Sequence, residues 1–422
     1  MPRKTLKCSV AVAGIAAAMI WSQPAAATNG YFVNGFDVSA QGMAGAGLSE
    51  GDGPVSSAAN PAVGIKMGRV AGGCLSLFMP NRSATVGNGG ALTPGTYTSK
   101  DDLFLIPCAG ANTLVNDTTA VGVSLVANGG METRYTGNPF APLSASTTTP
   151  LGVALQQAFI SLNGAHKLTD SFTVGLAPVL AVQSIRTYGL EAFESASQSP
   201  ANVTGRGDDW SYGGGLRVGA VWDADRYLSL AAAYQTRMWM SRFHKYAGMF
   251  ADSAKFDIPA ELSAGVTVRP VSGIAVMLDW QRIFYSDVAA IGNTELGDIQ
   301  ASPLGSPAGP GFGWKDMDVF HVGVKWDATD TLTLRTGYSY ATDAFNPGEA
   351  EFNLISPGII QHHASVGATY RVTPHWSVDG AYTHAFANTV DGTGNPTFHS
   401  GNQPISLKLS EDIATAGISY RW

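Results

Sequence analysis

Along most of the chain, large apolar side chains occupy every second position, and small or polar side chains occupy the positions between them. The pattern is clear in residues 228–235, 274–281, 320–326 and 376–386. Successive side chains of a β-strand point to opposite faces, so each run predicts a strand with one apolar and one polar face. The chain is therefore predicted to be all-β.

Two kinds of connection alternate between the predicted strands. Compact turns lie at residues 116–118, 167–170, 223–225, 269–273, 327–330 and 372–375. Longer segments rich in Gly, Pro, Ser and Asn lie near residues 81–101, 128–150, 185–209, 241–255, 286–315, 342–359 and 388–403. Short periplasmic turns and long extracellular loops are typical of outer-membrane barrels, which have an even number of strands. The count predicts an all-β membrane protein, a 14-stranded antiparallel transmembrane β-barrel over residues 67–422.

The composition is consistent with a wall that faces lipid. Only 14% of the residues are charged, whereas a soluble globular chain carries about a quarter. Lipid-facing and lumen-facing residues alternate in a barrel strand, so the charge content stays low without long apolar runs. The formal net charge of −7 argues against a nucleic-acid partner, which requires clustered Lys and Arg.

The chain ends in an aromatic strand. One face of residues 413–422 carries Ala414, Ala416, Ile418, Tyr420 and Trp422. A terminal aromatic residue with a second one two positions earlier resembles the signal that delivers barrels to the bacterial outer membrane. We therefore expect Tyr420 and Trp422 to contact the barrel assembly machinery. The alternative is the last strand of a soluble sandwich.

The opposite end has the features of a signal peptide. Basic residues within positions 3–7 precede an apolar run at 10–20, and Ala25-Ala26-Ala27 provides a cleavage site of small residues. The apolar run is too short to span a membrane as a helix. We predict that residues 1–27 are removed and that both termini of the mature barrel are periplasmic.

Residues 28–66 do not have the pattern of strands. They are rich in Gly and Ala, and Gly permits close backbone approach and unusual dihedral angles. A segment of about forty residues is too small to bury a core of its own. We predict an N-terminal hatch, a compact plug in the barrel lumen. A disordered leader is the alternative.

Short motifs in this segment carry a family resemblance. They are Gly30-Tyr31-Phe32, the run Gln41-Gly42-Met43-Ala44-Gly45-Ala46-Gly47, the acidic Glu50 and Asp52, and Asn60-Pro61-Ala62. With the aromatic last strand, they resemble the FadL family of outer-membrane transporters for long-chain fatty acids and aromatic hydrocarbons. The resemblance implies a fourteen-stranded barrel with a hatch, in which Gly42, Gly45 and the Asn60-Pro61-Ala62 motif serve gating.

Asn128, Gly129 and Gly130 lie at the end of the third predicted strand. Glycine in a strand interior marks a bulge or a bend. In the family that the chain resembles, a kink at this place opens the barrel wall sideways. We therefore predict a lateral opening at these residues. The alternative is that they begin an ordinary loop.

Two segments carry the candidate substrate contacts. Tyr31, Phe32 and Phe36 resemble the part of the family's N-terminus that touches the deeply bound ligand. An apolar loop adds Trp239, Met240, Phe243, Tyr246 and Phe250 at helix-like spacing, with Arg242 and Lys245 between them. An exposed apolar patch is typical of a binding surface, and the two basic residues could pair with a carboxylate head group. The alternative is a loop helix packed on its neighbours.

Cys74 and Cys108 fall on the first two predicted strands, which are neighbours in an up-and-down barrel. Export permits a disulfide, provided that both side chains face the same side at a suitable separation. The sequence leaves a disulfide and two free thiols equally open.

Together, these features predict passive uptake of long-chain fatty acids or other small hydrophobic molecules across the outer membrane, by loop capture, hatch gating and lateral release. A general aqueous diffusion porin is the alternative. We find no His-Glu-x-x-His motif and no catalytic triad, so we expect no enzyme activity, no cofactor and no metal. We expect a monomer that contacts outer-membrane lipid and lipopolysaccharide.

Overall fold

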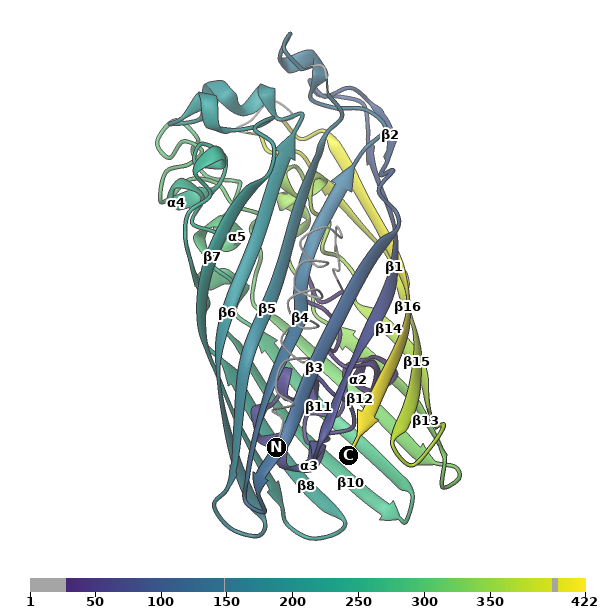
Figure 1. Cartoon of the computed structure of the whole chain (residues 1–422). Coiled ribbons are helices and arrows are strands. Elements are labelled where there is room, and N and C mark those ends of the chain that lie inside the picture. Colours follow the sequence, from purple (N-terminus) through teal and green to yellow (C-terminus); the bar gives the residue numbers. More distant parts are fainter. Residues whose placement is uncertain (1–27, 148, 397–400) are drawn as a thin grey trace, which may run out of the picture.

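The computed structural model describes residues 28–147, 149–396 and 401–422 (Figure 1). The predicted signal peptide, residues 1–27, lies outside the described residues. None of the helices in the described ranges is long and apolar enough to cross a membrane.

Fourteen antiparallel strands form a closed barrel, which confirms the predicted fold (Figure 1). The strands are β1 (Val70–Val86), β3 (Phe104–Asn116), β4 (Thr119–Arg134), β5 (Gly152–Lys167), β6 (Phe172–Tyr188), β7 (Asp209–Asp223), β8 (Leu228–Gln235), β10 (Glu261–Val271), β11 (Ile274–Ile283), β12 (Met317–Asp327), β13 (Leu332–Ala341), β14 (His362–Arg371), β15 (Trp376–Thr393) and β16 (Pro404–Arg421). Each pairs with its neighbours in the chain, and β16 returns to pair with β1. Closure matters because an open sheet edge would leave backbone groups unsatisfied in lipid.

All six predicted short turns join consecutive strands. The long loops contain β2 (Gly95–Thr98), η3 (Ala141–Leu143), η4 (Glu191–Ala196), η5 (Pro200–Asn202), β9 (Trp239–Met240), η6 (His244–Tyr246), α4 (Ala251–Ala254), η7 (Tyr285–Asp287), α5 (Ala289–Gly292), η8 (Pro347–Glu349) and η9 (Phe352–Leu354). Three loops are shorter than predicted, because β1, β4 and β15 continue to Val86, Arg134 and Thr393. Polar side chains on these strand ends gave the sequence the composition of a loop.

The strands present their apolar face outward. In β8, Tyr234 is 40% exposed, whereas its neighbours Ala233 and Gln235 are buried. Near the short turns, a ring of exposed aromatic side chains comprises Trp222, Tyr227, Trp326, Tyr370 and Trp376. Amphipathic rings of this kind suit the boundary between membrane and water. The exposed apolar face is therefore suited to contact with lipid.

Residues 28–69 lie inside the barrel, most of them in the half nearer the short turns (Figure 1), while the first residues reach up along β4. They form α2 (Val38–Gln41), η1 (Ser56–Ala58), η2 (Pro61–Val63) and α3 (Gly64–Met67). Helix α2 contacts β14, β15 and β16, while η2 contacts β5, β6 and β7. The segment thus touches the wall on several sides, and we call it the hatch.

Candidate functional site

The barrel wall is interrupted between β3 and β4. The last paired residues are Ala109 and Leu125, although β3 continues to Phe104 along β1 and β4 continues to Arg134 along β5. Nearer the long loops the wall closes again, because the amide of Lys100 donates to the carbonyl of Arg134 at 2.8 Å. Residues 101–108 and 126–133 therefore border a gap in strand pairing, which we call the window.

A kink in β4 forms one side of the window. Asn128 is an extra residue in β4 with no residue opposite it in the register with β5, because Ala127 pairs with Ala158 and Gly129 pairs with Gln157. Gly129 has a φ of +158°, and a Cβ atom there would lie 1.7 Å from the Tyr31 carbonyl oxygen. Only glycine fits such a position. The predicted Asn128-Gly129-Gly130 segment thus lies within a strand, at the edge of the window.

The start of the hatch occupies the free edge of β4. The Val33 amide donates to the Asn128 carbonyl at 3.0 Å, and the Gly130 amide donates to the Tyr31 carbonyl at 3.0 Å. These contacts satisfy backbone groups of β4 that β3 does not pair, and an unsatisfied backbone group in an apolar environment costs several kcal/mol. The N-terminal segment therefore takes the place of a neighbouring strand.

Aromatic side chains hold the hatch terminus in place. The ring of Tyr31 lies 5.3 Å from Tyr285 and 5.9 Å from Trp314, centroid to centroid. The Tyr285 hydroxyl accepts from the Tyr31 amide at 3.2 Å and donates to the Asn29 carbonyl at 2.6 Å. Burial raises the pKa of both phenols well above the ordinary value, so both stay neutral. Tyr285 and Trp314 were missed by sequence analysis because they are remote in sequence from the hatch.

The second predicted aromatic residue, Phe32, is buried beside Tyr31. Phe36 is half-buried, and the guanidinium of Arg217 lies 5.2 Å from its ring centroid. A cavity of about 60 Å³ touches Phe32, Phe36 and Asn128. An apolar cavity of about 150 Å³ accepts benzene, so this cavity is too small for a monoaromatic hydrocarbon.

Ion pairs fasten the hatch to the wall near the short turns. The Asp52 carboxylate lies 2.7 Å from Lys325 Nζ and 3.1 Å from Arg335 Nη2, and Glu50 pairs with Arg269. Burial alone would raise the pKa of Asp52, but the two adjacent cations outweigh it and hold the pKa well below the ordinary value. A polar vestibule of about 840 Å³ adjoins Asp52. The two acidic residues belong to a local motif, whereas their partners Lys325 and Arg335 are remote in the chain and carry no local signal.

The Asn60-Pro61-Ala62 motif joins the hatch to β6 and β7. Asn60 is fully buried, and its side chain accepts from the Ala62 amide at 3.0 Å and donates to the Leu48 carbonyl at 3.0 Å. Pro61 occupies the first position of η2, where its missing N–H is not needed. A Cβ on Gly219 of β7 would lie 1.9 Å from Asn60 Oδ1. The Asn60 side chain can therefore take this position only because β7 has a glycine opposite it.

The two glycines predicted to serve gating also lie at close contacts. A Cβ on Gly42 would lie 3.0 Å from Gly367 of β14. Gly45 has a φ of +91°, and its Cβ would lie 2.3 Å from Asn34 Oδ1. Gly45 therefore excludes a larger side chain, whereas at Gly42 a Cβ would make a tight contact with β14.

The predicted extracellular contact residues do not form an exposed patch. Met240, Phe243, Tyr246 and Phe250 are buried, whereas Trp239 is 58% exposed. Their segment forms the separate short elements η6 and α4 instead of one helix. The apolar spacing reflects packing among the loops. The alternative, a loop helix packed on its neighbours, is right about the packing and wrong about the helix.

The two basic residues of this loop already have partners. Arg242 pairs with Asp252 at 2.9 Å, and Lys245 Nζ donates to the Asp208 carbonyl at 2.6 Å. Both contacts hold neighbouring loop segments together. A head-group role for Arg242 or Lys245 would require that these contacts break.

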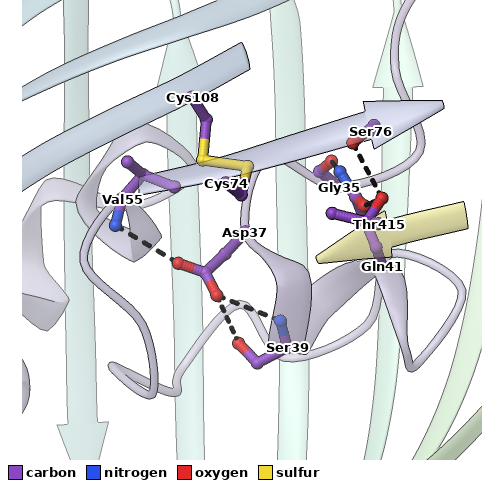
Figure 2. Close-up of a disulfide and its surroundings, with 9 residues drawn as sticks. All are labelled: Gly35, Asp37, Ser39, Gln41, Val55, Cys74, Ser76, Cys108 and Thr415. Atoms are coloured by element: carbon purple, nitrogen blue, oxygen red, sulfur yellow. Dashed lines mark hydrogen bonds between the residues drawn. A yellow bond between two sulfur atoms is a disulfide. The ribbon is translucent and has the colours of Figure 1, made fainter. Parts of the chain in front are cut away.

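Cys74 and Cys108 are directly opposite each other on β1 and β3 and form a disulfide (Figure 2). The bond lies at the end of the window nearer the short turns, because Cys108 is next to Ala109, the last residue of β3 that pairs with β4. Figure 2 shows it beside Val55, whose amide donates to Asp37 of the hatch at 3.2 Å. The disulfide thus fixes β3 to β1 where β3 lacks its other neighbour.

One sequence feature was overlooked. Residues 47–51 have the Gly-x-Ser-x-Gly spacing of a hydrolase nucleophile, centred on Ser49. The Ser49 hydroxyl bonds to Thr267 Oγ1 at 2.7 Å and to Glu50 at 3.2 Å. The motif also lacks the strand-to-helix turn that exposes such a nucleophile. The geometry provides no catalytic arrangement at Ser49.

Comparison with known proteins gives one family and several similar folds. Residues 17–422 match the family described as outer membrane protein transport protein (OMPP1/FadL/TodX). Over 110 residues the chain is 34% identical to the 47 kDa outer membrane protein of Pasteurella multocida (strain Pm70). That match covers 26% of this chain and only 23% of the length of the relative.

Solved structures share the fold at low sequence identity. The toluene transporter TodX of P. putida has a TM-score of 0.69 at 16% identity, over 92% of this chain and 99% of that chain. A Pseudomonas aeruginosa FadL homologue has a TM-score of 0.69 at 16% identity, over 93% and 99%. The Ralstonia pickettii toluene transporter TbuX has a TM-score of 0.63 at 19% identity, over 92% and 99%.

Proposed function

Because the chain belongs to the outer membrane protein transport protein family (OMPP1/FadL/TodX), we propose that it carries small hydrophobic molecules passively across the bacterial outer membrane. The molecule enters through the loops, passes the hatch terminus and leaves sideways through the window into lipid. Monoaromatic hydrocarbons and long-chain fatty acids are the candidate substrates. The former are suggested by the toluene transporters among the structural neighbours.

The observation that carries this proposal is that the hatch terminus fills a gap in the wall. Tyr31 and Val33 bond to the free edge of β4 beside the kink at Gly129. When this segment withdraws, the window connects the lumen with the membrane interior. Transfer of a hydrophobic molecule from water into lipid lowers its free energy by about 25 cal/mol per Å² of apolar surface buried. Release through the window delivers the molecule to lipid without a return to water.

We further propose that the hatch is the gate and that both chain termini lie on the periplasmic side. The ion pairs of Asp52 and Glu50 hold the body of the hatch to the wall, while its first residues make mainly backbone and aromatic contacts. Movement confined to residues 28–36 would therefore open the window without releasing the whole plug. Gating by a chain segment of this kind proceeds on a timescale of microseconds to milliseconds.

A general aqueous porin is the competing function, and deleting residues 28–60 distinguishes the two. Liposomes that contain the full-length or the deleted protein are compared for swelling in a small sugar and for uptake of toluene. A gated hydrophobic transporter excludes the sugar until the hatch is deleted. Equal sugar permeation by both proteins would show a porin, and unchanged toluene uptake after deletion would contradict hatch gating.

A further inference from the structure

Three charged side chains lie buried at the window. Arg82 of β1, Glu132 of β4 and Glu411 of β16 are 5%, 3% and 1% exposed. We call them the window triad. Burying a charge costs several kcal/mol unless it is paired and hydrogen-bonded. Their position therefore requires an explanation.

The strand register places the three residues around one spot. Arg82 is opposite Leu409, and Glu411 is opposite Pro80 on the same two strands. Both side chains are therefore diagonal neighbours on the inner face of the wall. Arg82 interacts electrostatically with both Glu411 and Glu132, so Glu132 completes the group from the other side of the window.

Glu132 is on the face of β4 that would contact lipid in an unbroken wall. It pairs with Ala154 of β5, whereas the next residue of β5, Leu155, is buried and faces inward. Side chains alternate along a strand, so Ala154 and Glu132 are on the outward face. It is nevertheless buried, and it interacts electrostatically with Asp101 of the segment that closes the window. Glu132 therefore points into the window itself.

Each member of the triad has an unpartnered polar atom. Arg82 Nε, Glu132 Oε2 and Glu411 Oε2 are buried without a hydrogen-bond partner. Within residues 28–147, 149–396 and 401–422, no ion pair of 4.0 Å or less joins Arg82 to either glutamate. The other end of the Arg82 guanidinium, Nη2, donates to the Asp101 carbonyl. An intervening polar group can bridge polar atoms that lie beyond hydrogen-bond distance.

An apolar surface adjoins the triad. It consists of Phe78, Phe104, Ile106 and Ala127, with Val33 of the hatch packed against it. The guanidinium of Arg82 lies 5.7 Å from the centroid of the Phe104 ring. A molecule that passes through the window would therefore meet an apolar surface with a polar group at one end.

We propose that the window triad binds the hydroxyl group of a hydrophobic alcohol or phenol on its way into the membrane, an inference that rests on the proposed function. A hydroxyl accepts from the Arg82 Nε–H and donates to a glutamate, so it satisfies both kinds of unpartnered atom. A carboxylate would add a further acidic group beside Glu132, Glu411 and Asp101, which also interacts with Arg82. A plain hydrocarbon would satisfy none of the three side chains.

Binding of three probes with one common ring tests the proposal: toluene, p-cresol and p-toluate. Isothermal titration uses the complete barrel in lipid nanodiscs, with empty nanodiscs subtracted. Changing Arg82→Leu together with Glu411→Leu should lower the ratio of p-cresol to toluene affinity about tenfold, the value of one hydrogen bond to a charged group. The control, Arg371→Leu with Asp330→Leu, removes one exposed cation and one exposed anion near the short turns and should leave the ratio unchanged.

A second variant is expected to increase the affinity for p-toluate, a result that misfolding cannot produce. Glu132→Gln with Glu411→Gln keeps the shape of both side chains and leaves Arg82 with Asp101 as its one acidic neighbour among the described residues. We expect p-toluate affinity to rise at least about tenfold in this variant. No gain would contradict the charge argument and overturn the proposal.

The outcomes separate this proposal from the proposed function. If toluene binds but the p-cresol ratio is the same in the Leu variant and the parent protein, water alone satisfies the triad and the proposal is wrong. If the parent protein prefers p-toluate, the triad is a carboxylate site and the proposal is equally wrong. If neither toluene nor p-cresol binds, the proposed function fails as well.

Discussion

The backbone amide of Gly130, in the middle of a barrel strand, donates a hydrogen bond of 3.0 Å to the carbonyl of Tyr31, near the start of the hatch. The two residues are far apart in sequence, yet their contact closes the wall where β3 and β4 separate. It is a backbone contact, so it depends on chain geometry more than on side-chain identity. On the proposed function, the described conformation is the closed state of the window.

Replacing Gly129 with Ala should displace the hatch terminus. The added Cβ would lie 1.7 Å from the Tyr31 carbonyl oxygen, so the bonds of Tyr31 and Val33 to β4 cannot form. Hydrogen exchange at the amides of Val33 and Gly130 should accelerate at least about tenfold, the equivalent of losing about 1.4 kcal/mol of protection. Gly89→Ala is the control, since it also has a positive φ but has open space around it. Unchanged exchange in G129A would refute the contact.

Acid should loosen the attachment of the hatch through Asp52. Its folded-state pKa is depressed, so its contribution to stability is complete above the unfolded pKa of about 4 and is lost as the pH falls toward the folded pKa. The urea midpoint of the parent protein should therefore drop between pH 6 and pH 3 more than that of Asp52→Asn. At pH 7 this variant should be destabilised by about 3 kcal/mol. Asp330→Asn, at an exposed turn of the same barrel end, controls for loss of charge, and equal midpoints for D52N and the parent protein would contradict the assignment.

The disulfide should stabilise the barrel without being needed for transport. It closes a loop with a sequence separation of 34 residues, which corresponds to about 4 kcal/mol of lost conformational entropy in the unfolded chain. Changing Cys74→Ser together with Cys108→Ser should lower the urea midpoint while toluene uptake persists. If uptake disappears from folded protein, the bond has a direct role in the window. An unchanged midpoint would instead show that β1 and β3 need no covalent link.

Much of the fold follows from local pattern. The turns near Asn116, Asp225 and Pro374 joined consecutive strands as predicted, because turn chemistry and the period of two are local signals. The loop boundaries at residues 81, 128 and 388 were wrong, because strand ends beyond the lipid carry polar side chains like those of loops.

The site was only partly predictable. Gly129 was identified because glycine inside a strand marks a bulge or a bend and because the family that the chain resembles has a kink at this place. The buried Phe243 and Tyr246 were interpreted as an exposed surface, since helix-like spacing does not reveal which face is covered. The proximity of Arg82 to Glu411 could not be predicted from local sequence, because it arises only when the last strand pairs with the first. The sequence does place each charged residue at an inward position of its strand, and that was the only indication.

The rate of toluene uptake after deletion of Asn128 tests lateral release most directly. Without this residue, β4 has an unbroken register with β5, and the kink that borders the window is lost. Deletion of Gly205, which lies in open space in a loop, is the matched control. We predict that uptake into liposomes falls at least about tenfold, equivalent to about 1.4 kcal/mol, while the control transports normally. Equal uptake by both folded proteins would show that the substrate does not leave through the window.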